Sequence, residues 1–207
     1  MKMSPITPLL NFGNAGAAVR FVSAGRFELL GDSLIRRSIE FALAAHRGQL
    51  RASGEPFIMH PLSVAQILAV DGESAATVAA GVAHDVLEDT DVTSRELIAA
   101  LGPDVAAIVN LMTKPTPDDE PPIIALAPHI VTDSDSIVLC ALSAKFADRT
   151  HNLATIGALP RWRQVRMARE TLEILYPAAS RVGHRRSEPL RQMALRVLEG
   201  ESIQAAA

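Results

Sequence analysis

Histidines and carboxylates are concentrated between residues 46 and 90, in a pattern that could bind a metal ion. His84 and Asp85 are adjacent, and Glu88 and Asp89 follow one helical turn later. Adjacent helix residues point about 100° apart, so an imidazole and a shorter carboxylate can still converge on one ion. Residues four apart share a helix face, which places Glu88 near His84 and Asp89 near Asp85. One interpretation is that the segment is a helix end at the surface, where the acids are solvated. If the helix is buried, as its apolar character indicates, its charged groups must be paired or must bind a metal.

Two residues outside this helix complete a candidate ligand set. His60 precedes Pro61 at the start of another apolar helix, and Asp148 lies in a polar cluster that follows a third apolar run. Alone, His60 suits a structural histidine, and Asp148 suits a surface ion pair with Arg149 or Lys145. Together the set has two imidazoles, two carboxylates and no thiolate, which favours Mn²⁺, Fe²⁺ or Zn²⁺ over Ca²⁺. Open coordination positions would allow activation of water, so the sequence predicts a metal-dependent phosphohydrolase.

Helices must position these residues, because apolar side chains recur at helical spacing and no convincing strand pattern is present. Capping residues and prolines set the predicted boundaries. The loop over residues 51–56 and the acidic, proline-rich loop over residues 114–122 interrupt the pattern. We predict an all-α bundle of roughly eight to ten helices. The main helices are expected over residues 33–47, 60–70, 75–89, 94–101, 104–112, 136–148, 161–175 and 190–198.

Length and composition limit the remaining classes of function. The chain has 207 residues, 48% of them hydrophobic and only 4% aromatic, and its formal net charge is −3. We expect an irregular N-terminal extension over residues 1–30 and a single domain over residues 31–207. The acidic balance argues against nucleic acid as a partner, and no run is long enough to span a bilayer. The single Cys140 excludes an internal disulfide, so a reducing cytoplasm is the expected location.

Three segments resemble the HD hydrolase domain of RelA/SpoT homologues, in the order and at the intervals of that family. They are Arg51–Pro61 (RASGEPFIMHP), His84–Thr90 (HDVLEDT) and Ala147–Leu153 (ADRTHNL). The resemblance covers about residues 33–183 and ends in a segment, residues 176–183, similar to the one that closes the family's domain. Because the chain leaves no room for a synthetase domain, it resembles the stand-alone small alarmone hydrolases, such as the metazoan SpoT homologue.

This resemblance implies an activity, a cofactor and a role for each motif residue. The implied reaction is Mn²⁺-dependent hydrolysis of the 3′-pyrophosphate of (p)ppGpp, giving GDP or GTP plus pyrophosphate, in an HD-type helical bundle with a small-molecule nucleotide as its partner. The implied metal ligands are His60, His84, Asp85 and Asp148. Glu88 and Asp89 would position and deprotonate the attacking water. Arg51 would stack on the nucleobase, while Ser53, Asn152 and Thr155 would contact the nucleotide.

Departures from the family pattern leave the substrate open. Ala52, Phe57 and Ala154 stand where the family usually has lysine, tyrosine and arginine, so (p)ppApp or NADPH are alternative substrates. Another HD nucleotide phosphohydrolase and a non-catalytic alarmone-binding module are the alternative functions.

Other polar residues near the motifs have less specific expectations. His46 belongs to the family's His-x-x-Gln motif, and we expect it to be structural or to support a ligand. Lys145 and Arg149 are candidates either for phosphate contact or for orienting Asp148. His151 is expected to shape the turn beside Asn152.

Overall fold

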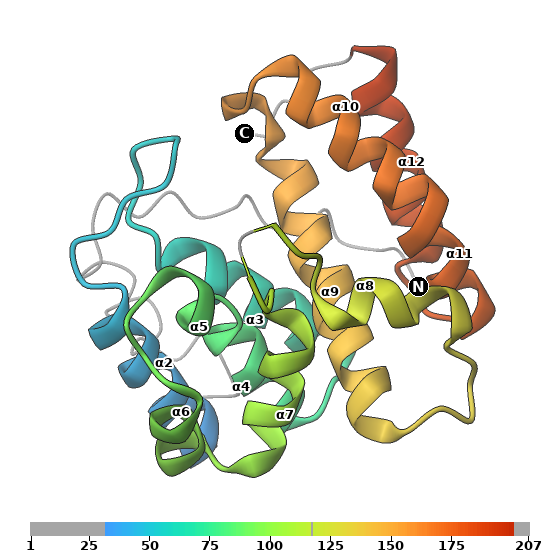
Figure 1. Cartoon of the computed structure of the whole chain (residues 1–207). Coiled ribbons are helices and arrows are strands. Elements are labelled where there is room, and N and C mark those ends of the chain that lie inside the picture. Colours follow the sequence, from blue (N-terminus) through green and yellow to red (C-terminus); the bar gives the residue numbers. More distant parts are fainter. Residues whose placement is uncertain (1–31, 117, 201–207) are drawn as a thin grey trace.

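Figure 1 shows that the chain folds as a helical assembly around one long helix. The computed structural model describes residues 32–116 and 118–200. Its elements are α2 (Ser33–Ala45), α3 (Met59–Asp71), α4 (Ala75–Ala83), α5 (Val86–Asp89), α6 (Ser94–Leu101), α7 (Pro103–Met112), α8 (Pro122–Leu126), η2 (Ala127–His129), α9 (Ser136–Ala154), η3 (Ile156–Ala158), α10 (Arg161–Glu170), the π-helix η4 (Thr171–Leu175), α11 (Tyr176–Arg181) and α12 (Ser187–Glu199).

The all-α prediction is confirmed. Within the described ranges, strand-like pairing is limited to a single antiparallel bridge between Leu50 and Pro56. None of the helices in these ranges is both long and apolar enough to cross a bilayer. The predicted N-terminal extension, residues 1–30, lies outside the described residues.

Helix α9 lies between the earlier helices and the C-terminal group α10–α12 (Figure 1). It contacts α3, α4 and α7 on one side and α12 on the other. A helix enclosed in this way must be apolar on most of its surface, which explains why Ala141, Leu142, Phe146 and Leu153 are all buried. Polar side chains that α9 directs inward are therefore surrounded by protein.

Side-chain caps explain why three predicted helices begin where expected. Asp32 accepts hydrogen bonds from the backbone N–H groups of Leu34 and Ile35 at the start of α2. Ser74 accepts from the N–H of Thr77 at the start of α4. Thr93 forms a reciprocal capping box with the third residue of α6. Each cap satisfies an N–H group that the first turn of a helix leaves unpaired.

Two predicted helices are interrupted in the structure. The expected helix over residues 75–89 is divided into α4 and α5 by a turn at His84 and Asp85. The expected helix over residues 161–175 changes to π-helical geometry at Thr171 and continues as α11. Helix α9 extends to Ala154, six residues beyond the predicted end. No proline or glycine lies at the turn between α4 and α5, whereas Pro177, which has no N–H to donate, lies two residues after the π-helix.

Close packing of α3 on α4 depends on small residues. Residues Thr77–Ala83 of α4 are all buried and consist mainly of alanine, valine and one glycine. A Cβ atom at Gly81 would lie 2.4 Å from Leu68 Cδ1 and 3.3 Å from Val64 Cγ1, both on α3. Leu68 is itself 1% exposed, so its side chain has little room to move away. The absence of a side chain at Gly81 therefore lets the two helices approach.

We predict that Gly81→Ala lowers the free energy of unfolding by about 1 kcal/mol. Overpacking a core costs about 1–3 kcal/mol, which exceeds the gain of up to about 1 kcal/mol from replacing a helical glycine by alanine. Urea denaturation measures the change. The control is Gly157→Ala, where a Cβ would meet no atom within 4 Å. Equal or greater stability of Gly81→Ala would contradict this account of the α3–α4 contact.

Candidate active site

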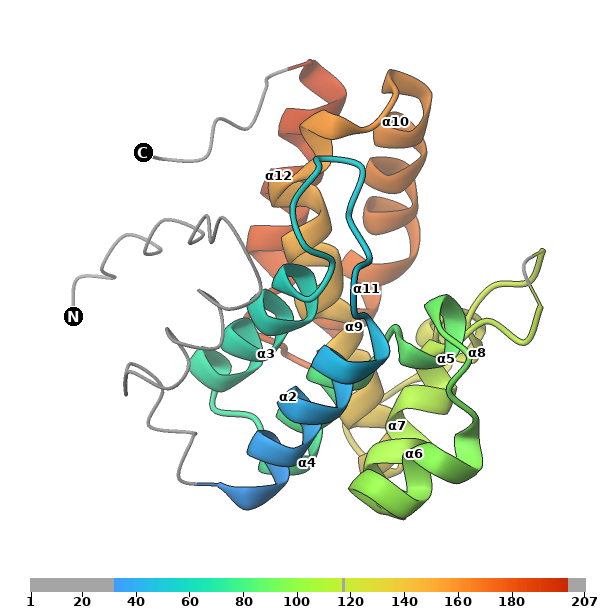
Figure 2. The same ribbon diagram turned by 90° about the vertical axis from the view of Figure 1, so that its left-hand side faces the viewer.

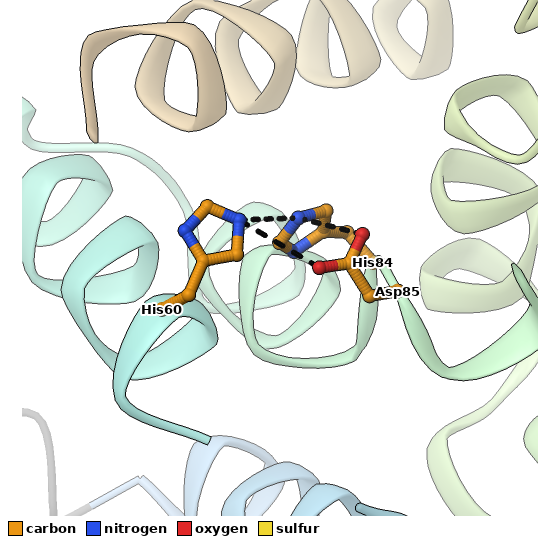
Figure 3. A group of neighbouring side chains, drawn as sticks. All are labelled: His60, His84 and Asp85. Atoms are coloured by element: carbon orange, nitrogen blue, oxygen red, sulfur yellow. Dashed lines mark hydrogen bonds and ion pairs between the residues drawn. The ribbon is translucent and has the colours of Figure 1, made fainter. Parts of the chain in front are cut away.

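The turn between α4 and α5 directs the His-Asp pair toward α3. His84 ends α4, and its Nδ1 donates to the backbone oxygen of Gly81 at 2.9 Å. The backbone oxygen of Asp85 then accepts from the N–H groups of Glu88 and Asp89, which begins α5. In a continuous helix the two side chains would point in directions about 100° apart. The turn changes these directions, so both side chains can face His60. Figure 3 shows the two imidazole rings and the Asp85 carboxylate converging.

Four predicted ligands meet in this space. The ligand atoms of His60, His84 and Asp85 all lie within 4.8 Å of one another. The two Nε2 atoms are 3.2 Å apart, and His84 Nε2 lies 3.1 Å from Asp85 Oδ1. Asp148 Oδ1, from α9, lies 3.2 Å from His60 Nε2 and 3.7 Å from His84 Nε2. Three separate segments of the chain thus contribute to one cluster.

The electrostatics of the cluster show how strongly it attracts positive charge. Burial disfavours the charged form of His84, but the carboxylates of Asp85 and Asp148 outweigh burial and raise its pKa to about 10. Burial likewise opposes ionisation of Asp85, yet the adjacent His84 lowers the pKa of that carboxyl to about 2. For His60 burial dominates and lowers the pKa. In the absence of a cation, the cluster therefore retains a proton on His84 between its carboxylates.

These donors fit a divalent cation. Because His84 uses its Nδ1–H to donate to Gly81, its other ring nitrogen, Nε2, is the one directed into the cluster. Imidazole nitrogens and carboxylate oxygens brought together at 3.1–3.7 Å offer the mixed ligation that Mn²⁺, Fe²⁺ and Zn²⁺ accept. A cation would occupy this space in place of the proton and balance the two buried carboxylates.

Neighbouring side chains fix the orientation of Asp148. Lys145 Nζ donates to Asp148 Oδ2 at 2.8 Å, and Asn152 Nδ2 donates to Oδ1 at 2.6 Å. Burial favours the neutral acid, but the charge of Lys145, together with His84, outweighs it and holds the pKa of Asp148 well below its ordinary value. Of the two roles left open for Lys145, the structure supports orientation of Asp148.

Arg149 points away from the cluster, toward the C-terminal helices. Its guanidinium donates to the backbone oxygen of Met167 at 3.0 Å, to Thr171 Oγ1 at 2.9 Å, and to the Glu170 carboxylate. The side chain is buried, so these contacts join α9 to α10 at the start of the π-helix. Neither orientation of Asp148 nor phosphate contact is supported for Arg149.

The two acids predicted to handle water lie on α5, beside the cluster. Both are exposed, and Glu88 Oε1 accepts a hydrogen bond from the backbone N–H of Lys114 at 2.7 Å. Partial loss of hydration at the Asp89 carboxyl, together with the charges of Asp85 and Glu88, raises its pKa. A carboxylate with a raised pKa is a better proton acceptor near neutral pH. This shift supports the predicted role of Asp89 as a base.

A pocket next to the cluster contains every predicted nucleotide contact. Arg51, Ser53, Asn152 and Thr155 line it, together with Ala52, Glu55, Ala158 and Leu159. Figure 2 shows the loop between α2 and α3 rising along the C-terminal end of α9, which brings these residues together. The loop is closed by the hydrogen bond from Arg51 N–H to the backbone oxygen of Glu55 at 2.9 Å and turns at Gly54, where φ is +85°. Arg51 also donates to Asn152 Oδ1 at 3.1 Å.

His46 supports this loop and has no contact with the cluster. Its Nδ1 donates to Gln49 Oε1 at 2.8 Å, and its ring stacks on Phe57 with centroids 4.6 Å apart. Gln49 Nε2 in turn donates to the backbone oxygen of Asp89 at 2.7 Å. The motif thus connects the end of α2 to α5, in agreement with the structural role expected for His46.

Sequence reasoning missed one residue of the site. His151 is 4% exposed, and its Nδ1 lies 2.7 Å from His60 Nδ1 and 3.3 Å from Arg51 Nη1. Burial, with the nearby charges of His60 and Arg51, lowers its pKa to about 3. Its position three residues after Asp148 was the available signal, since i and i+3 share a helix face.

The chain is similar to known proteins in sequence and in fold. Residues 38–119 match the family model described as HD domain. The chain is 32% identical over 184 residues to the GTP pyrophosphokinase rsh of Brucella melitensis, covering 85% of this chain and 24% of that protein. It is 38% identical over 161 residues to the guanosine-3′,5′-bis(diphosphate) 3′-pyrophosphohydrolase of Vibrio cholerae, covering 72% and 22%. The chain thus spans less than a quarter of either relative's length.

A solved structure has a similar fold. It is described as "A metazoan ortholog of SpoT hydrolyzes ppGpp and plays a role in starvation responses", and it superposes with a TM-score of 0.61. The match covers 84% of this chain and 98% of that chain at 21% identity. At this level of identity the likeness establishes a shared fold.

Addition of Mn²⁺ should raise the melting temperature of the protein, because an ion that binds only the folded state stabilises it. At a free Mn²⁺ concentration of about 100 times the dissociation constant, the free energy of unfolding rises by about 2.7 kcal/mol. We expect Asp85→Ala to lose most of this shift. Asp91→Ala removes an exposed acid six residues further along and should keep the shift. Differential scanning fluorimetry measures the melting temperatures. An Mn²⁺-induced shift in Asp85→Ala as large as that of the wild type would show that the ion binds elsewhere.

Proposed function

We propose that this chain, whose residues 38–119 belong to the HD domain family, is a Mn²⁺-dependent hydrolase of the 3′-pyrophosphate of alarmone nucleotides. The observation that carries the proposal is the position of the His60–His84–Asp85–Asp148 cluster beside the pocket that holds Arg51. The names given to the Vibrio cholerae relative and to the similar solved structure support the same reaction. The products would be GDP or GTP and pyrophosphate.

The proposed ligands are His60, His84, Asp85 and Asp148. A divalent cation held there would supply positive charge that acidifies water and offsets charge developing on phosphorus. Lys145 and Asn152 keep the Asp148 carboxylate in a fixed orientation through their hydrogen bonds to its two oxygens. Such support matters because ligands that are free to rotate lose metal affinity.

The remaining side chains would bind substrate and transfer protons. The Arg51 guanidinium can stack on a base while its charge attracts phosphate, and Ser53, Asn152 and Thr155 offer polar contacts from the same pocket. Asp89, with Glu88 beside it, would accept the proton of the attacking water. The water oxygen would then bond to the 3′-linked phosphorus, the bond from that phosphorus to O3′ would break, and O3′ would take up the proton that Asp89 accepted and leave as a hydroxyl.

The cytoplasm is the proposed location and a small nucleotide the proposed partner. A single cysteine, Cys140, places no demand on an oxidising compartment. The formal net charge of −3 does not favour binding to nucleic acid.

A substrate panel tests both the reaction and the nucleobase that the substrate carries. Purified protein with Mn²⁺ is incubated with ppGpp, ppApp and NADPH, and pyrophosphate and orthophosphate are measured separately. We expect pyrophosphate from ppGpp in the wild type, no turnover in Asp85→Ala, and wild-type turnover in Asp91→Ala. Pyrophosphate from ppApp or orthophosphate from NADPH as the main product would reassign the substrate. Turnover retained in Asp85→Ala would refute the site.

Asp89→Asn separates proton transfer from metal binding. Loss of a general base typically lowers kcat by about 10²–10⁴-fold, whereas the Mn²⁺-induced rise in melting temperature should remain, because Asp89 is not a proposed ligand. Asp91→Asn serves as the matched control, and steady-state kinetics at saturating Mn²⁺ gives the comparison. A wild-type kcat in Asp89→Asn would transfer the role of base to Glu88.

A further inference from the structure

A chain of hydrogen bonds joins the pocket to the metal cluster through His151. The His151 ring lies between two partners that come from different segments: Arg51 from the loop after α2, and His60 from α3. Both contacts reach the same ring atom, Nδ1, at 3.3 Å from Arg51 Nη1 and 2.7 Å from His60 Nδ1. His151 is buried, so water does not readily replace either contact.

The chemistry of arginine sets the direction of these bonds. A guanidinium has only donors, so the nitrogen of His151 that it contacts must accept. An accepting Nδ1 carries no proton, and the short contact to His60 then requires His60 Nδ1 to donate. A neutral His60 with its proton on Nδ1 has its lone pair on Nε2. That nitrogen lies in the cluster, 3.2 Å from both His84 Nε2 and Asp148 Oδ1.

The two histidines of the cluster are therefore held in the same tautomer by different acceptors. His84 donates to the backbone oxygen of Gly81, and a substitution of Gly81 would leave this oxygen in place. His60 depends on a side chain, that of His151, which in turn depends on Arg51. A histidine ligand must present an unprotonated nitrogen to the metal, and its other nitrogen decides which one is available.

We propose that His151 is a positioning residue: by accepting hydrogen bonds from Arg51 and His60 at the same nitrogen, it keeps His60 Nε2 free to bind the metal. The inference rests on the proposed function only in taking His60 as a metal ligand. It adds a second role for Arg51, which belongs to the pocket and yet sets the protonation pattern of a ligand on α3.

A parallel connection reaches the other side of the cluster. Arg51 Nη2 donates to Asn152 Oδ1, and Asn152 Nδ2 donates to Asp148 Oδ1. One guanidinium thus organises one ligand from α3 and one from α9. Removal of Arg51 should weaken metal binding even though Arg51 does not belong to the cluster.

The direct test observes the tautomer of His60 in metal-free protein. Long-range ¹H–¹⁵N correlation spectra distinguish protonated from unprotonated ring nitrogens, and the chain has only six histidines. The signals of His60 are identified by their absence in His60→Gln. We expect His60 with its proton on Nδ1 in the wild type, and a shift of the proton toward Nε2 in His151→Leu.

The matched variants separate acceptor loss from loss of the ring. His151→Asn keeps an oxygen acceptor close to the place of Nδ1 and should keep the His60 tautomer, whereas His151→Leu removes it. Calorimetric titration with Mn²⁺ should show an affinity loss of about 10-fold or more for His151→Leu, a smaller loss for Arg51→Met, and little change for His151→Asn. His129→Leu, at an exposed histidine on η2, is the control.

Each outcome decides the proposal. A wild-type His60 protonated on Nε2, or an unchanged tautomer and Mn²⁺ affinity in a folded His151→Leu, would overturn it. Circular dichroism of each variant confirms folding before the comparison. The tautomer is measured without metal or substrate. The result therefore decides this proposal even if the protein does not hydrolyse alarmones.

Discussion

Ligand atoms that repel one another are held within a few ångströms in a buried space, and much of the structure provides for this. Two imidazole nitrogens lie 3.2 Å apart, and both lie close to the carboxylates of Asp85 and Asp148. Buried groups of this kind are costly unless a proton or a cation lies among them. The high pKa of His84 and the low pKa of Asp85 are consequences of that requirement. The same requirement makes the cluster a site for a divalent ion.

Close packing of α4 on α3 helps to hold the ligands together. Gly81 lets α4 approach α3, and its backbone oxygen also accepts a hydrogen bond from His84 Nδ1–H. A single residue thus contributes both to the distance between the helices and to the orientation of a ligand. Helix α9 completes the arrangement because it is enclosed on two sides, which restricts where Asp148 and His151 can point. The π-helix and Arg149 fix α9 against α10 from the opposite side.

The departures from the family pattern fall in different surroundings. Ala52 lines the pocket, where a shorter side chain removes a charge from the wall that would face a nucleotide. Phe57 instead stacks on His46 and helps to hold the loop, so its missing hydroxyl affects the support of the pocket. Glu55 adds a carboxylate to the pocket lining. Substrate preference is therefore expected to depend more on residues 51–55 than on Phe57.

The sequence alone was sufficient for the all-α fold and for most helix starts, because these depend on local signals. Asp32, Ser74 and Thr93 cap helices through bonds to residues two or three positions away. The resemblance to a known family then related His60, His84, Asp85 and Asp148 to one another across the chain. The roles assigned to these four ligands, to Glu88 and Asp89, and to the nucleotide-contacting residues remain predictions.

Tertiary structure alone decided the turn at His84, the separate roles of Lys145 and Arg149, and the place of His151. The turn sets His84 and Asp85 beside His60 of α3 and Asp148 of α9, partners that lie far away in the sequence. Lys145 and Arg149 are four residues apart on α9, yet one meets Asp148 and the other meets α10. His151 gains its meaning from Arg51, about a hundred residues earlier in the chain. Contacts between residues so far apart leave no periodic or spacing signal, and only the folded chain brings the donor and the acceptor together.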